Sequence, residues 1–167
     1  MALSIARVLR HLFAGSARRL YPEASLQRIA AAIAEGERSH RGETCFAVEA
    51  SLPLRAVLAG EDAATRAREL FAQLGVWDTA ANNGVLLFLL LADHRIEIVA
   101  DRGLEGRVSA EQWRGVCQLM EERLRAGEPE AAATAGIAAA AALLAEHFPR
   151  GADDHDVNEL PDLPRIL

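Results

Sequence analysis

Cysteine is nearly absent from this chain of 167 residues, which contains only Cys45 and Cys117. Two cysteines this far apart build neither a disulfide framework nor a zinc site, because both need several ligands at close spacing. Cys45 lies in an apolar strand pattern and Cys117 in a helical one. We therefore expect both to be buried, reduced thiols.

Long apolar runs and a surplus of basic residues are also missing. The longest apolar run covers residues 85–92, well short of the roughly 20 residues that a membrane-spanning helix needs. Arginines interrupt the amino-terminal stretch where a signal peptide would carry its apolar segment. The net charge of −6 argues against nucleic-acid binding, which needs a basic surface. These absences predict a cytoplasmic protein without a nucleic-acid partner.

What the chain does contain is a set of helix and strand patterns that fits one domain. Apolar residues make up 51% of the sequence, enough for a substantial core. Helical periodicity and helix boundary signals cover residues 22–42, 53–75, 109–127 and 129–148, and strand patterns cover residues 43–51, 84–91 and 95–101. Ser109, followed by Gln112, matches a capping box at the start of one of these helices.

The order of these elements predicts an α/β fold. The strands at 43–51 and 84–91 are joined through a helix, so we expect them to be parallel, with a right-handed crossover. The strand after them returns antiparallel as a hairpin. Residues 85–91 are apolar without alternation, which indicates a strand buried on both faces. The prediction is a three-layer α/β/α sandwich, in which helices cover both faces of a small mixed sheet made of a parallel pair plus an antiparallel hairpin.

The two ends of the chain differ in charge and set the expected boundaries: an amphipathic segment at 1–20, the α/β domain at 21–149 and an acidic tail at 150–167. Residues 1–20 carry four arginines and no acidic residue. Two interpretations stay open for this segment: peripheral contact with an anionic membrane, or docking on its own domain. The acidic residues of the tail are Asp153, Asp154, Asp156, Glu159 and Asp162.

Polar side chains gather on both sides of the predicted hairpin. A turn centred near Asp93-His94 pairs Leu91 with Ile96, and this register puts the loop before residue 84 beside the loop after residue 101. The oxygen-bearing side chains expected at this edge are Asp78, Asn82, Asn83, Asp101 and Glu105, with Glu43 at the start of the first strand. Such ligands suit a hard cation, calcium or magnesium, although aspartates and asparagines also build turns and caps.

The opposite edge of the sheet offers a competing location. Ligands of open α/β sheets usually bind at the carboxyl ends of the parallel strands, which here points to Ser51, Asp93 and His94. We favour the Asn82/Asp101 edge because its loops are longer and richer in side-chain oxygens.

The block from Asn82 to Gly106 resembles the TPM domain family. Its segments Asn82-Asn83-Gly84-Val85-Leu86 and Asp101-Arg102-Gly103-Leu104-Glu105-Gly106 are similar to the family pattern NNGVLLLVA…RIEVGYGLEG, although Ala100-Asp101-Arg102 replaces the usual Gly-Tyr. The resemblance extends over roughly residues 22–148. It implies an α/β/α sandwich, calcium binding, and a weak acid phosphatase activity that is found in some members.

Two functions follow as hypotheses. The first is a non-catalytic interaction domain, modulated by a divalent cation at the Asn82/Asp101 edge, with a protein partner that the sequence does not identify. The alternative is a weak metal-dependent phosphomonoesterase, in which Asp78 or Asp101 supplies a nucleophile or metal support and Arg102 clamps the phosphate.

Overall fold

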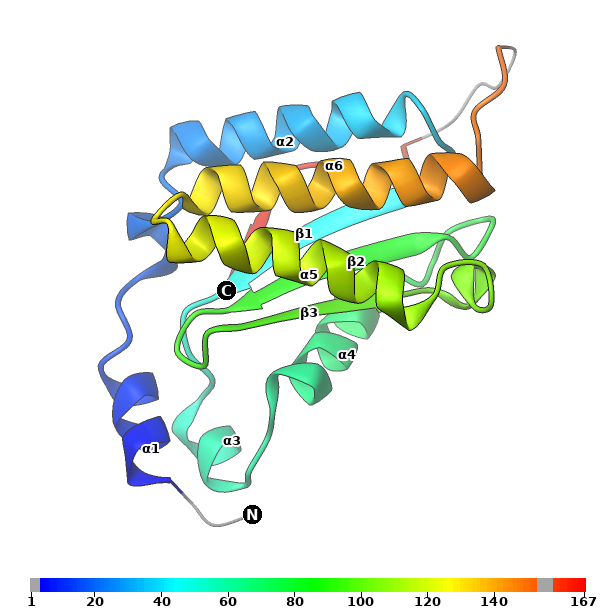
Figure 1. Cartoon of the computed structure of the whole chain (residues 1–167). Helices are drawn as coiled ribbons and strands as arrows, with labels where there is room; N and C mark the ends of the chain where they lie inside the picture. Colours follow the sequence, from blue (N-terminus) through cyan, green and yellow to red (C-terminus); the bar gives the residue numbers. More distant parts are fainter. Residues whose placement is uncertain (1–3, 153–157) are drawn as a thin grey trace.

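The computed structural model describes residues 4–152 and 158–167 of the chain. In chain order the elements are α1 (Ile5–Leu12), η1 (Ala17–Arg19), α2 (Glu23–Glu37), β1 (Glu43–Glu49), α3 (Leu54–Leu58), α4 (Ala63–Gln73), β2 (Gly84–Leu90), β3 (Arg95–Ala100), η2 (Arg102–Leu104), α5 (Ala110–Arg125), α6 (Pro129–His147) and β4 (Arg165–Ile166). The sheet lies between two helical layers, with α2, α5 and α6 on one face and α3 and α4 on the other (Figure 1). The predicted α/β/α sandwich is therefore confirmed.

The position of β2 inside the sheet explains why its sequence does not alternate between apolar and polar residues. Every residue of β2 is buried, because helices cover both faces of the sheet at this strand. Val85, Leu87 and Leu89 pack toward α2, α5 and α6, whereas Leu86 and Phe88 pack toward α4. The sheet thus separates two apolar cores, and together they fix which face each strand residue presents.

The sheet has the strand order β3-β2-β1-β4. β1 pairs in parallel with β2, and β2 pairs antiparallel with β3, as the sequence predicts. The hairpin register differs from the prediction by two residues, since Ile96 faces Leu89 and not Leu91. The turn occupies residues 91–94, and His94 closes it in the left-handed conformation, with φ of 51° and its N–H donating to the Leu91 carbonyl. A slip of two residues keeps every side chain on its predicted face.

A fourth strand comes from the segment that the sequence indicates as an acidic tail. β4 pairs in parallel with β1 through Arg165 and Ile166. The Glu43 carboxylate accepts the backbone N–H groups of Glu159 and Leu160, each at 3.1 Å. Glu43, expected among the oxygen donors of the cation edge, therefore anchors the end of the chain. The tail acids Asp153, Asp154 and Asp156 lie outside the described residues.

Both cysteines are free thiols, as expected, but only Cys45 is buried, whereas Cys117 is half-buried. Burial raises the pKa of Cys45 to about 11, so the thiolate is scarce at neutral pH. Across the two described stretches, 4–152 and 158–167, no helix is long and apolar enough to cross a bilayer.

Candidate functional site

Two loops distant in sequence meet at the amino-terminal end of β2. The N–H of Asp101 donates to the Gly84 carbonyl at 2.9 Å, and the N–H of Gly103 donates to the Asn82 carbonyl at 2.8 Å. The Asn82 side chain also accepts a hydrogen bond from Arg102 Nε at 3.0 Å. Gly103 permits this contact, because a Cβ there would collide with the carbonyl oxygens of Ala81 and Asn82. The segments around Asn82 and Asp101 therefore share one edge.

Asp101 combines a helix-capping oxygen with a second carboxylate oxygen that is shielded from solvent. Its Oδ1 accepts the N–H of Arg102 at 2.7 Å and so caps η2. Its Oδ2 is shielded from solvent and has no hydrogen-bond partner among the described residues. A buried carboxylate oxygen left unpaired is costly, so it favours any donor or cation that can reach it.

Asn83 is fully buried but points elsewhere. Its Nδ2 donates to the Arg41 carbonyl at 2.9 Å, and its backbone N–H donates to Thr79 Oγ1 at 3.0 Å. Strand alternation puts Asn83 on the face of Val85, toward α2 and α6, while Asp101 lies on the opposite face, toward α4. Asn83 Oδ1 also has no partner in the described part of the chain, yet it does not face the Asp101 carboxylate.

Asp78 and Glu105 are both exposed, and neither side chain makes a hydrogen bond or an ion pair within the described ranges. No three His, Cys, Asp or Glu side chains of residues 4–152 and 158–167 are grouped so as to hold a metal ion. A cation at this edge would therefore take Asp101 Oδ2 and complete its shell with backbone carbonyls and water, as calcium and magnesium do.

The opposite edge is organised around the hairpin turn. The Asp93 carboxylate accepts hydrogen bonds from Arg7, with Nη2 at 2.7 Å, and lies 3.1 Å from His11 Nε2. His11 Nδ1 accepts the N–H of Leu52 at 3.0 Å, so the ring proton lies on Nε2, facing Asp93. Burial alone would raise the pKa of Asp93, but the hydrogen bonds and charge of Arg7, with His11 Nε2 close by, hold that pKa below its usual 3.8. These contacts dock α1 on its own domain.

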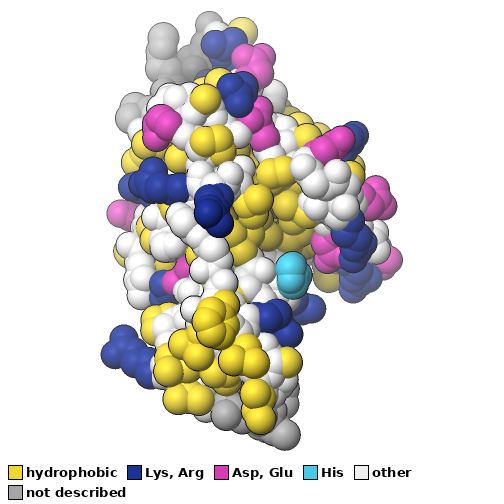
Figure 2. Space-filling view, turned by 90° about the vertical axis from the view of Figure 1, so that its left-hand side faces the viewer, with side chains coloured by type: hydrophobic (Ala, Val, Ile, Leu, Met, Phe, Trp, Pro, Cys, Tyr) yellow, Lys and Arg dark blue, Asp and Glu magenta, His cyan; other side chains and the backbone are white. Residues whose placement is uncertain are grey.

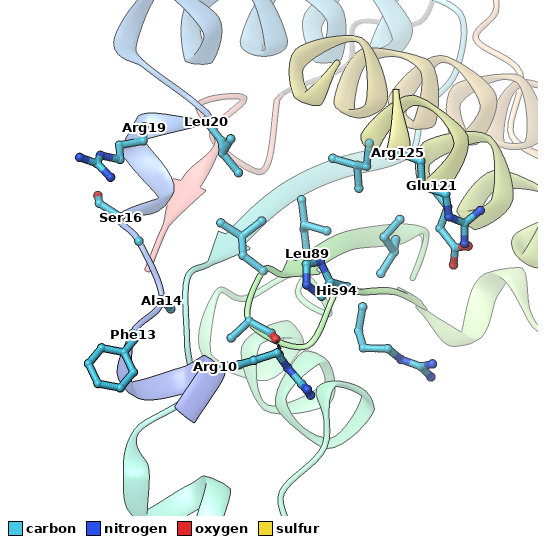
Figure 3. Close-up of a pocket in the computed structure, with 16 residues that line it drawn as sticks. Arg10, Phe13, Ala14, Ser16, Arg19, Leu20, Leu89, His94, Glu121 and Arg125 are labelled. Atoms are coloured by element: carbon cyan, nitrogen blue, oxygen red, sulfur yellow. Dashed lines mark hydrogen bonds and ion pairs between the residues drawn. The ribbon is translucent and has the colours of Figure 1, made fainter. Parts of the chain in front are cut away.

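A cavity of about 1060 Å³ opens beside this turn, between residues 10–20, the β2–β3 hairpin and the end of α5 (Figure 3). Its lining combines leucines with four arginines. His94, the turn residue that the sequence indicated at this edge, is one of the residues that line the cavity (Figure 3). No pattern in the sequence predicts this cavity, although two of its four arginines, Arg10 and Arg19, belong to the basic stretch of residues 1–20.

A family model described as TPM domain, whose name also carries the word phosphatase, matches residues 20–143. The chain belongs to the TPM domain family. No curated protein matches it.

Two solved structures resemble this TPM domain. The NMR structure of the BA42 protein from the psychrophilic bacterium Bizionia argentinensis aligns with a TM-score of 0.74 at 26% sequence identity, covering 85% of this chain and 92% of that one. The N-terminal domain of a protein from P. gingivalis aligns with a TM-score of 0.61 at 18% identity, covering 90% of this chain and 99% of that one. The second likeness concerns the fold alone.

Proposed function

We propose that this TPM domain is a non-catalytic interaction module whose Asn82/Asp101 edge binds a divalent cation, calcium or magnesium. The observation that carries the proposal is the Asp101 carboxylate, whose Oδ1 caps η2 while its Oδ2 is buried without a hydrogen-bond partner in the described chain. A hard cation would satisfy that oxygen and add rigidity to both loops.

The same edge carries features that suit a protein partner. Trp77, in the loop before β2, is 53% exposed, and its Nε1 donates to the Ala72 carbonyl at 3.2 Å, which fixes the ring at the surface. An exposed, oriented tryptophan is a common anchor of protein interfaces. The carboxylates of Asp78 and Glu105 are exposed on the two loops of this edge, so a bound cation would change the charge that a partner meets.

Thermal unfolding in millimolar calcium or magnesium tests this function. A ligand that binds only the folded state at 100 times its Kd adds about 2.7 kcal/mol to the free energy of unfolding, which amounts to several degrees in Tm for a chain of this size. Asp101→Asn is expected to abolish the shift, whereas Glu146→Gln, on the exposed surface of α6, is expected to keep it. An unchanged Tm for the wild-type chain with both ions would contradict cation binding.

A weak phosphomonoesterase is the second candidate. The family model's name favours it, and the open carboxylate oxygen of Asp101 adjoins Arg102, which is exposed but hydrogen-bonded to Asn82. Hydrolysis of an aryl phosphate by the wild-type chain and by Asp101→Asn decides the matter. Turnover that survives undiminished in Asp101→Asn would remove Asp101 from the chemistry, and a cation-dependent Tm shift without turnover would support the interaction module instead.

A further inference from the structure

The cavity beside the hairpin turn has an apolar floor. Leu20, Leu89, Ile96 and Leu124 contribute side chains to it, and Leu89 and Ile96 belong to the larger apolar core. The cavity lies at the carboxyl end of β2, the position where open α/β sheets usually bind ligands. It therefore continues the core outward as a surface that an alkyl chain can cover.

The rim of the same cavity is basic in a chain whose net charge is negative. Four arginines line it against one acidic side chain, Glu121, which is itself paired with Arg125 at 2.8 Å. Arg10 is held in place by a hydrogen bond from Nε to the Ala92 carbonyl at 2.9 Å. The Arg19 side chain is exposed and makes no hydrogen bond or ion pair within the described residues. Arg10, Arg95 and Arg125 each lie within 3.6 Å of a carboxylate, those of Asp93, Glu97 and Glu121. Within the described residues, Arg19 therefore supplies the unpaired positive charge beside the apolar floor.

We propose that this cavity binds an amphiphilic anion, a molecule with a carboxylate or phosphate head group and an alkyl tail. The head group takes the guanidinium groups of the rim, since arginine recognises both anions through paired N–H donors. The tail covers the leucine floor and is removed from water. Neither contact alone defines the ligand, because the floor would accept any apolar chain and the rim any small anion.

Calorimetric titration with dodecanoate and dodecyl phosphate, below their micellar concentrations, tests this assignment. We expect both to bind at one site, and dodecyltrimethylammonium and inorganic phosphate to bind far more weakly. Arg19→Glu is expected to weaken binding about tenfold, while Arg18→Glu, an equally exposed neighbour that does not line the cavity, is expected to leave it within about twofold. Equal binding of the cationic amphiphile, or equal losses in the two variants, would overturn the proposal.

The floor has its own matched pair of variants. Leu20, which is 44% exposed, lines the cavity, and Leu58, which is 52% exposed on α3, does not. Leu20→Ser should weaken dodecanoate binding and leave the weak affinity for inorganic phosphate unchanged, whereas Leu58→Ser should change neither. A loss of dodecanoate binding in Leu58→Ser of the same size would show that the chain binds the alkyl tail nonspecifically.

A separate observation concerns α1, which docks with its polar side inward. Arg7 and His11 contact Asp93 and Val8 packs against the core near α4, whereas the remaining large apolar side chains of this segment face solvent. These exposed side chains are Ile5 (74%), Leu9 (47%), Leu12 (55%) and Phe13 (80%). The space-filling view shows a hydrophobic cluster at this end of the molecule with basic side chains beside it (Figure 2). A helix that only served the fold would show the reverse orientation.

From this orientation we infer that the outer face of α1 docks on an anionic bilayer surface. Residues 1–20 contain four arginines and no acidic residue, which complements anionic head groups, and an apolar face of this kind inserts at the boundary of head groups and acyl chains. Arg7 and His11 hold the helix rigidly to the domain, so the apolar side chains are presented without a folding step.

Co-sedimentation with vesicles of phosphatidylcholine alone, or mixed with phosphatidylglycerol, tests the second inference. The full chain should sediment with the anionic vesicles and much less with the neutral ones. The double variant Ile5→Ser, Leu9→Ser should lose this binding. The control variant Leu163→Ser should retain it, because the Leu163 side chain is similarly exposed, at 47%, but lies outside α1. Equal sedimentation with both vesicle types, or undiminished binding by the double variant, would overturn it. The inference would also fall if the wild-type chain were a dimer in solution and the double variant a monomer, because the apolar face would then be an interface between two copies.

Discussion

Replacing Asp93 by asparagine should release α1 from the domain. The carboxylate side chain is only 9% exposed and is shared by Arg7 and His11, with Arg10 at 3.5 Å. Asparagine keeps the shape of the side chain but carries no charge and turns an N–H₂ group toward groups that can only donate. Arg7 and the Nε2 side of His11 would then face an amide. We expect undocking of the helix to cost less free energy than keeping these donors against it.

The expected magnitude follows from the contacts that are lost. Hydrogen bonds to charged groups contribute about 1.5–3 kcal/mol each, and breaking a buried ion pair costs about 3–5 kcal/mol. The Arg7 side chain is 21% exposed, so water recovers part of this loss. We expect about 2.7 kcal/mol less docking free energy, which corresponds to a roughly 100-fold change in the opening equilibrium. A detached helix of eight residues is too short to persist alone.

Hydrogen exchange of the α1 amides measures this opening directly. Protection of residues 5–12 should fall about 100-fold in Asp93→Asn, while protection in β2 should stay near that of the wild-type chain. The Asp93 pKa is lowered in the folded chain, so its contribution is present above about pH 3.8 and is lost as the pH falls through the lower folded pKa. The difference between variant and wild type should therefore vanish in acid. Unchanged protection of α1 at pH 7 would refute the role of this contact.

Three further predictions concern the core and the edges of the sheet. Gly103→Ala should destabilise the chain by about 1–3 kcal/mol in urea unfolding, because its Cβ meets backbone carbonyl oxygens that have little room to move; a loss below about 0.5 kcal/mol would contradict that close approach. Leu160→Ala should cost about 2–3 kcal/mol, since the side chain is buried in the core near α4, and the exposed Leu163→Ala should cost far less. Cys45, whose pKa burial raises to about 11, should react with a thiol reagent at pH 8 only as fast as the chain unfolds; rapid reaction of the native chain would show that the strand is open.

The sequence predicts the elements that local patterns define. The uninterrupted apolar run of β2 marks a strand buried on both faces, and the structure agrees. The capping box is present as expected, with Ser109 Oγ accepting the Gln112 N–H at 3.2 Å and the Gln112 side chain accepting the Ser109 N–H at 2.8 Å. Such signals lie within a few residues of each other, so no tertiary information is needed to interpret them.

Features that depend on residues far apart in the chain could not be predicted from the sequence. Amphipathicity shows that the first helix has two faces, but only its contact with Asp93, 86 positions away from Arg7, decides which face turns inward. β4 covers two residues that follow Pro164, and its neighbourhood is tied down by the carboxylate of Glu43, 116 positions before Glu159. No local pattern encodes either contact.

The meeting of two loops at the candidate cation edge was predicted, whereas the contacts of their side chains were not. The hairpin does bring the loops of Asn82 and Asp101 together, because antiparallel pairing places the ends of β2 and β3 side by side. The sequence could not show that Arg102 occupies Asn82 Oδ1, or that Asn83 turns to the opposite face and bonds Arg41. Those outcomes depend on side-chain competition within the folded edge, which leaves Asp101 as the carboxylate with a buried free oxygen.

A residue-resolved NMR titration with calcium or magnesium shows whether a cation binds at the Asn82/Asp101 edge. We expect saturable amide shifts confined to residues 78–83 and 101–106, and their loss in Asp101→Asn. Shifts that gather instead around residues 10–20 and 91–96, or an unchanged spectrum at saturating cation, would contradict the assignment of a cation site to the Asn82/Asp101 edge.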